Sequence, residues 1–107
     1  MARAYLGEFE RTVLMALVRL QSNAYGIPIR AEISKRLGRD VNIGAVYTTL
    51  DRLHEKGLVS SRWGGPTRQR GGRAKRYFEI TAPGEQALRE SLLAVSRMSG
   101  DWAAAKG

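Results

Sequence analysis

Hydrophobic residues recur at intervals of three and four in four stretches of the chain, which is the spacing of amphipathic helices. The first stretch has Glu8 and Glu10 in its opening turn, where acidic side chains suit the helix dipole. Capping residues and glycines mark where helices begin and end. We therefore expect helices at about residues 7–20, at about 27–37, from a cap at Asn42 to a stop at Gly57, and from a cap at Thr81 to about Ser99.

Two runs of apolar, hydroxyl and aromatic residues precede the last helix and predict strands at about residues 59–63 and 75–80. The long connection between them predicts a hairpin with an extended tip. The order helix, helix, helix, strand, strand, helix is the layout of a winged helix-turn-helix. We expect a mainly α fold with a small β-hairpin, in which residues 1–80 form the winged helix-turn-helix domain and residues 81–107 form a C-terminal dimerisation helix and tail.

The third predicted helix has an apolar side and a polar side. Val46, Leu50 and Leu53 form the stripe that should face the core. The N-terminal half of the outward side is small, polar and uncharged, and acidic residues follow later. At about 100° per residue, the outward side carries Gly44, Thr48, Asp51 and Glu55, with Arg52 beside them and with Tyr47 and His54 on the other flank.

Composition narrows the class of partner. The 107-residue chain has a formal net charge of +8 and an isoelectric point near 10.6. So large a basic excess favours a polyanionic partner, either nucleic acid or an anionic membrane surface, although composition alone also allows a merely basic surface. No apolar run approaches the roughly 20 residues that span a bilayer, and the N-terminus lacks a signal-peptide core, so we expect a cytoplasmic protein. The cluster of basic residues lies in the predicted hairpin and not on a strongly amphipathic cationic helix, so we expect no membrane partner.

The residues that commonly carry catalysis or bind metals are scarce. Cysteine is absent and His54 is the one histidine, which excludes disulfides, thiolate metal sites and histidine-cluster sites within one chain. The three aspartates are scattered, and no nucleophile lies at a readable spacing from a base. The glycines of the hairpin lie in the wrong context for a phosphate-cradling loop. We therefore expect no enzymatic activity, no metal and no cofactor.

Residues 62–76 are a strongly basic segment in the hairpin. They hold six positive charges, no negative charge and four glycines. Guanidinium groups on a deformable loop suit phosphate, whereas the plain alternative is a solvated loop without a function. We expect phosphate contacts from Arg68, Arg70, Arg73, Lys75 and Arg76.

Three segments resemble the PadR family of bacterial transcriptional regulators. Residues 42–59 (NIGAVYTTLDRLHEKGLV) are similar to the third helix and the start of the first strand in that family. Residues 73–84 (RAKRYFEITAPG) are similar to the second strand and the start of the last helix, and residues 25–29 (YGIPI) fit the start of the second helix. The pattern Gly-x-Val-Tyr-x-x-Leu-x-x-Leu, paired with a downstream Tyr-x-x-x-Thr, is fairly specific to the family.

The resemblance implies a dimer joined through the first and last helices. It also implies that the third helix enters the major groove of DNA and that the hairpin reaches the flanking backbone or minor groove. Some members of the family are released from DNA by small aromatic effectors. The single C-terminal helix of this chain fits the subgroup with a short C-terminal region and leaves little room for an elaborate effector domain.

These arguments give three groups of candidate site residues. On the third helix, phosphate repels Asp51 and Glu55, so they should point along the groove or away from it; the DNA contacts are expected from Asn42, Gly44, Tyr47, Thr48 and Arg52. The two apolar stripes of the last helix exceed what a small core covers, so a dimer core is expected from Phe9, Val13, Leu17, Leu88, Leu92 and Val95. Met98 and Trp102 are candidates for an effector pocket, although such residues are more often plain packing.

The leading hypothesis is a homodimeric, sequence-specific DNA-binding regulator that represses transcription by occluding a promoter. The alternative is a winged-helix module that binds protein or RNA and holds nucleic acid without regard to sequence. Neutralising Arg68, Arg70 and Arg73 separates them. If the leading hypothesis holds, affinity falls on all sequences while the preference set by the third helix persists.

Overall fold

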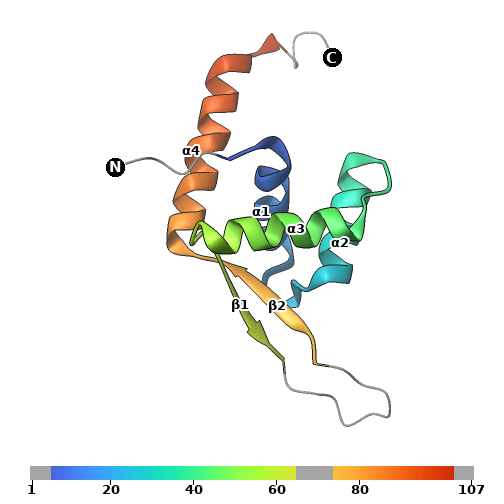
Figure 1. The fold of residues 1–107 in the computed structure, drawn as a ribbon. Coiled ribbons are helices and arrows are strands. Elements are labelled where there is room, and N and C mark those ends of the chain that lie inside the picture. The colour runs from blue at the N-terminus through green and yellow to red at the C-terminus, as the bar shows by residue number, and fades with distance from the viewer. Residues whose placement is uncertain (1–5, 65–73, 103–107) are drawn as a thin grey trace.

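The computed structural model of the protein describes residues 6–64 and 74–102 (Figure 1). The four expected helices and the hairpin are present, and a short 3-10 helix that the sequence did not predict follows the first helix. The second helix begins one residue earlier than expected and the second strand one residue later. The elements are α1 (Glu8–Leu20), η1 (Gln21–Asn23), α2 (Gly26–Leu37), α3 (Ile43–Glu55), β1 (Val59–Trp63), β2 (Arg76–Ile80) and α4 (Ala82–Ser99).

The core lies between α1, α2 and α3, and the base of the hairpin and the start of α4 close it. The stripe predicted on the third helix is confirmed, because Val46, Leu50 and Leu53 are fully buried. Thr49 of the same helix is also buried, which widens the inward side of α3. Other helices and the hairpin contribute Val13, Leu14, Leu17, Ile29, Ile33, Phe78 and Leu88 to the same cluster.

A partly buried ion pair joins the start of α1 to the residue that follows α3. Lys56 Nζ lies 2.8 Å from Glu10 Oε2, and the Gly7 amide donates to Glu10 Oε1 at 2.8 Å. Burial raises the pKa of the Glu10 carboxyl, but the hydrogen bonds from Lys56 and Gly7 outweigh burial, so its pKa lies below the ordinary value. Glu10 is therefore more than a dipole-compensating residue, because it ties together two helices that are distant in sequence.

The hairpin is attached to the helical core by backbone hydrogen bonds. Its strands are antiparallel, with Val59 opposite Ile80 and Trp63 opposite Arg76. The Phe78 amide donates to the Ala24 carbonyl at 2.8 Å, which connects β2 to the segment before α2. The hairpin formed by β1 and β2 is the wing of the fold. Its base is therefore held against the same helices that position α3.

Only the first half of α4 packs on the core. Thr81 caps the helix by accepting a hydrogen bond from the Gly84 amide at 3.1 Å. Gly84 is needed for close packing, because a Cβ at that position would overlap the Leu58 carbonyl oxygen. Leu88 is the last residue of α4 that is buried, and the helix then projects away from the core (Figure 1).

Candidate nucleic-acid interface

The start of α3 is fixed by a side-chain cap. Asn42 Oδ1 accepts hydrogen bonds from the Gly44 amide at 2.7 Å and the Ala45 amide at 3.3 Å, which confirms the predicted cap. The side-chain oxygen of Asn42 therefore already accepts two hydrogen bonds, and the side-chain amide nitrogen is the group that could bind a ligand. A Cβ at residue 44 would lie 2.9 Å from Asn42 Oδ1, so Gly44 leaves room for the cap as well as for a close approach from outside.

The turn between α2 and α3 is tied down at both ends. Gly38 ends α2 in the left-handed conformation, with φ of 70°. Arg30 Nε donates to the Val41 carbonyl at 2.7 Å, and the Val41 amide donates to Ser34 Oγ at 3.1 Å. These hydrogen bonds hold Val41, in the turn, against two residues of α2. They therefore fix the orientation of α3 relative to α2.

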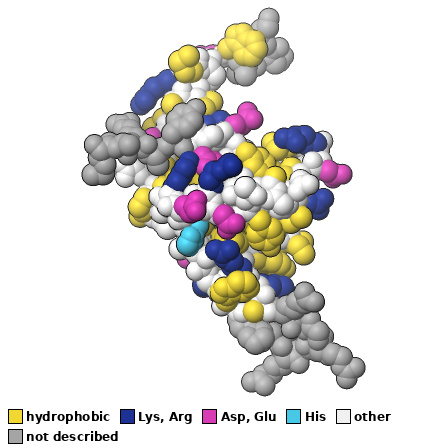
Figure 2. All heavy atoms as spheres, viewed as in Figure 1, with side chains coloured by type: hydrophobic (Ala, Val, Ile, Leu, Met, Phe, Trp, Pro, Cys, Tyr) yellow, Lys and Arg dark blue, Asp and Glu magenta, His cyan; other side chains and the backbone are white. Residues whose placement is uncertain are grey.

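The outward side of α3 is polar and exposed, as its spacing predicts. Gly44, Thr48 and Arg52 are exposed, and they lie opposite the buried stripe. Acidic and basic side chains lie next to one another on this face of the molecule (Figure 2). The N-terminal half of the outward side of α3 therefore carries small, uncharged side chains, and its C-terminal half carries acidic and basic ones.

Tyr47 has a packing role that the sequence did not reveal. Its side chain leans on the first turn of α2, where a Cβ at Gly26 would overlap the Tyr47 hydroxyl. The residue nonetheless keeps 41% of its surface exposed. Tyr47 therefore both fixes the spacing of α2 and α3 and presents part of its ring outward, and Gly26 is the residue that makes this possible.

Two exposed cations, Arg62 and Lys75, lie against aromatic rings at the base of the wing. The rings of Tyr25 and Tyr77 meet edge to face, with centroids 5.4 Å apart. Lys75 Nζ lies 4.9 Å from the centre of the Tyr25 ring, and Arg62 Cζ lies 4.9 Å from the centre of the Tyr77 ring. Arg62 is not among the site residues predicted from the sequence. It pairs with Tyr77 in the hairpin, and this pairing, which the sequence analysis did not assign, brings its guanidinium over that ring.

The remaining basic residues of the hairpin fall into two cases. Arg68, Arg70 and Arg73 lie outside the described residues. Arg76 is described and does not extend freely from the wing, because it lies 3.6 Å from Asp51 on α3. The described residues thus place Arg62 and Lys75 at the exposed base of the wing and turn Arg76 toward α3.

The residues expected at a dimer interface do not share one surface. Val13 and Leu17 are buried in the core of their own chain, and Leu88 is nearly so, whereas Phe9 is half-buried. Leu92 and Val95 are 39% and 44% exposed on the projecting half of α4. Of the six residues expected at the interface, the two that are exposed thus both lie on the outer half of α4.

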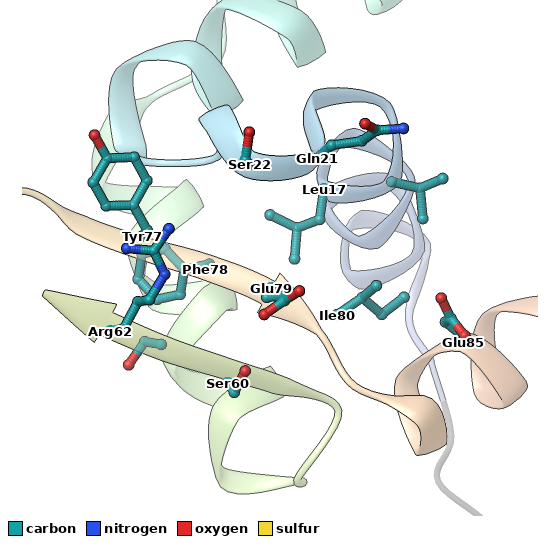
Figure 3. A pocket seen from close by; sticks show the side chains of 12 residues that line it. Leu17, Gln21, Ser22, Ser60, Arg62, Tyr77, Phe78, Glu79, Ile80 and Glu85 are labelled. Atoms are coloured by element: carbon teal, nitrogen blue, oxygen red, sulfur yellow. The ribbon is translucent and has the colours of Figure 1, made fainter. Parts of the chain in front are cut away.

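Two hollows lie outside α3. One, of about 480 Å³, lies between the end of α1, η1 and the hairpin, and its walls include Leu17, Ile80, Glu79 and Glu85 (Figure 3). The other, of about 430 Å³, is shallow and lies on α4 beside Val95 and Met98. The second hollow contains one of the two expected effector residues, and Met98 and Trp102 are 88% and 69% exposed.

Residues 6–64 and 74–102 contain neither a cluster suited to a metal ion nor a helix suited to a membrane. No three His, Cys, Asp or Glu side chains in that part of the chain are grouped closely enough to hold a metal ion. None of its helices combines the length and the apolar character that crossing a membrane requires.

Comparison with known proteins agrees with the fold. The transcriptional regulator PadR-like family matches residues 13–90. RosR from H. salinarum is 25% identical, with a TM-score of 0.69 over 92% of this chain and 82% of that chain. A PadR-like transcription factor from B. fragilis is 24% identical, with a TM-score of 0.70 over 85% of this chain and 82% of that chain.

A third structure, Bacillus subtilis PadR in complex with operator DNA, is 22% identical with a TM-score of 0.62. The match covers 79% of this chain and 46% of that chain. Likeness to the two structures below 25% identity shows a shared fold. No curated protein matches this chain in sequence.

Proposed function

The chain belongs to the PadR-like family of transcriptional regulators, and we propose that it is a homodimeric repressor that binds operator DNA and acts by occluding a promoter. The observation that carries this proposal is the outward side of α3. It is polar and exposed, its opposite side is fully buried, and it lies beside a cationic wing. The complex of B. subtilis PadR with operator DNA supports the same choice of partner.

On α3, the small residues of the first turns suit entry into the major groove. Gly44 and Thr48 let the helix approach the base edges closely, and Asn42 offers its amide nitrogen at the same end. Arg52 is exposed one turn after Thr48 and reaches a guanine edge or a phosphate. Tyr47 presents the exposed part of its ring to the backbone beside the groove.

The wing supplies affinity that does not depend on sequence. Arg62 and Lys75 stand at its described base, and Arg68, Arg70 and Arg73 belong to its tip. Each cation that neutralises a phosphate releases counterions, so binding weakens as salt rises. With three to five such contacts per subunit, the log–log salt slope of a dimer is about −5 to −9.

The projecting half of α4 forms the dimer contact. Leu92 and Val95 lie on one side of a helix that has no packing partner there within the described residues. Pairing with a second α4 covers this side, and Phe9 of α1 remains a candidate for the same contact because it is only partly buried in the core. We assign residues 1–80 to the DNA-binding domain and 81–107 to dimerisation. A two-fold dimer places its two α3 helices about one DNA turn apart.

A small aromatic effector is proposed to bind beside Met98 and Trp102. The shallow hollow on α4 is open on one chain, and a second chain would close it into a pocket. Occupation of that pocket changes the angle between the two subunits and so the spacing of the α3 helices. Fluorescence of Trp102 in a Trp63→Phe background reports binding of phenolic compounds, and an unchanged spectrum at millimolar compound removes this part of the proposal.

Competition binding tests the function as a whole. The labelled probe is the duplex upstream of the chain's own gene, and the competitors are the same duplex without label, a shuffled duplex of equal length and a structured RNA. We expect the specific duplex to compete at least 100-fold better than the shuffled one, with the steep salt slope given above. Equal competition by all duplexes contradicts sequence-specific regulation, and stronger competition by RNA supports the RNA-binding alternative.

A further inference from the structure

Arg76 is held in place by three neighbours at the base of the wing. Its guanidinium lies 3.6 Å from Asp51 Oδ1, and its Nε donates to Ser61 Oγ at 3.2 Å. The same guanidinium lies 4.9 Å from the centre of the Phe78 ring. Arg76 is thus oriented by a residue of α3, a residue of β1 and a residue of its own strand.

Asp51 is the member of this group that belongs to the interface with DNA. It lies on the outward side of α3, and its side chain is 64% exposed, whereas that of Arg76 is 30% exposed. An ion pair this exposed is weak by itself, and the hydrogen bond to Ser61 and the contact with the Phe78 ring help to keep Arg76 beside Asp51. The carboxylate also repels phosphate in any position where Arg76 does not screen it.

We propose that Asp51 is a specificity-determining residue, which withholds Arg76 from the DNA backbone and fixes the wing base at one angle to α3. This inference depends on the proposed DNA-binding function. In a complex with random DNA, phosphate contacts supply nearly all of the affinity, so a freed Arg76 strengthens that complex. In the operator complex, α3 and the wing must dock together, and the Asp51–Arg76 contact keeps them in register.

The decisive variants are Asp51→Asn, Arg76→Ala and the double variant, measured on operator and shuffled duplexes. We expect Asp51→Asn to bind the shuffled duplex about fivefold more tightly without a matching gain on the operator. Its salt slope becomes steeper by about one per subunit, because Arg76 now neutralises a phosphate. The Arg76→Ala variant should have the same salt slope as the natural chain. The double variant should have that slope too, because it has no Arg76 for Asp51→Asn to free.

Two control variants separate this role from simple charge removal. Glu55→Gln removes one negative charge from the same helix, and within the described residues Glu55 has no ion pair to the wing. It should raise affinity for both duplexes by the same factor. Lys75→Ala removes an exposed wing cation and should make the slope shallower by about one per subunit. Thermal unfolding of each variant checks that the fold is retained.

The inference is overturned if Arg76→Ala flattens the slope as Lys75→Ala does, or if Asp51→Asn changes the two affinities in the same way as Glu55→Gln. In either case DNA binding by the natural chain still stands. If the natural chain binds no duplex at all, the proposed function fails and this inference fails with it.

Discussion

Two helices of this molecule begin alike and end differently. Both α3 and α4 start at a side-chain cap, from Asn42 and from Thr81, and both bury one stripe in the core. The surface that α3 leaves exposed is mainly polar and charged, whereas the outer half of α4 exposes apolar side chains such as Leu92 and Val95. The difference indicates two kinds of partner, since a polar helix face suits hydrated base edges and an apolar one suits another protein.

The two helices also differ in how firmly they are held. The first turn of α3 is capped, its flank carries Tyr47 packed on Gly26, and its end is tied through Lys56 to Glu10. In the outer half of α4, Ser91 Oγ accepts a hydrogen bond from Arg11 Nη1 at 3.0 Å, and the residues after Ser91 are exposed. Under the proposed function, α3 is fixed before DNA binds, whereas the end of α4 is fixed by the second subunit.

The largest effect is expected from a charge on the apolar side of α4. Val95→Glu should leave the chain monomeric at micromolar concentration and lower operator affinity on the order of 100-fold, because a lone subunit holds only one half-site. Analytical ultracentrifugation and fluorescence anisotropy measure the two effects. Arg97→Glu, on the opposite side of the helix, is the control and should remain dimeric. A dimeric Val95→Glu variant would show that the contact lies elsewhere.

The next effect tests how α3 is held against α2. Gly26→Ala should lower the free energy of unfolding by about 1–3 kcal/mol, because its Cβ would overlap the Tyr47 hydroxyl. In a Tyr47→Ala background the same substitution should cost much less. Urea denaturation of the four variants gives the coupling energy. Additive losses would mean that Tyr47 and Gly26 do not constrain each other.

A smaller effect on stability is expected at the N-terminal end of α3. Gly44→Ala should change the free energy of unfolding by less than about 1 kcal/mol, since the gain in helix propensity offsets the crowded cap. Operator affinity should fall by about tenfold or more, because a methyl group stands where the helix meets the groove. Asn42→Ala is the complementary variant, and it should lower stability by about 1 kcal/mol through loss of the cap. Unchanged operator binding by Gly44→Ala would move the groove contact away from this end.

The last effect concerns stability alone and the ion pair between α1 and α3. Glu10→Gln should lower the free energy of unfolding by about 1–2 kcal/mol at pH 7, with Lys56 losing its charged partner. The folded-state pKa of Glu10 is depressed, so its contribution is present above the unfolded value of about 4.3 and is lost as pH falls through the folded value.

The pH series should therefore bring Glu10→Gln and the natural chain together as pH falls through the folded-state pKa of Glu10, which lies below its ordinary value. Glu32 also has a lowered pKa, through hydrogen bonds from Arg36 and Arg19, so the difference between the two proteins is the quantity to measure. A difference that stays constant down to pH 2 would contradict the ionic role of Glu10.

Local patterns predicted much of this fold. The cap at Asn42, the stripe of Val46, Leu50 and Leu53, and the bounds of β1 all follow from spacing within a few residues. The same patterns supported the match to a winged helix and the polar side of α3.

Contacts between distant residues were not readable from the sequence. Glu10 was interpreted as a dipole residue, yet its partner Lys56 is 46 positions away. The sequence predicts a phosphate contact for Arg76 but not its ion pair with Asp51, which lies 25 positions earlier on another element. Spacing also did not tell which apolar residues of α1 the core would cover, so Val13 could not be separated from the surface. Each of these depends on how elements pack, which periodicity does not contain.

Selection of binding sites from random duplexes tests the central claim most directly. The purified chain is mixed with a duplex pool, bound DNA is enriched over several rounds, and the winning sequence is footprinted. If α3 reads bases and α4 pairs two subunits, the winners share an inverted repeat whose half-sites lie about one helical turn apart, and Val95→Glu loses the double footprint. A pool without an enriched motif, or a single half-site protected equally by both proteins, would contradict the account.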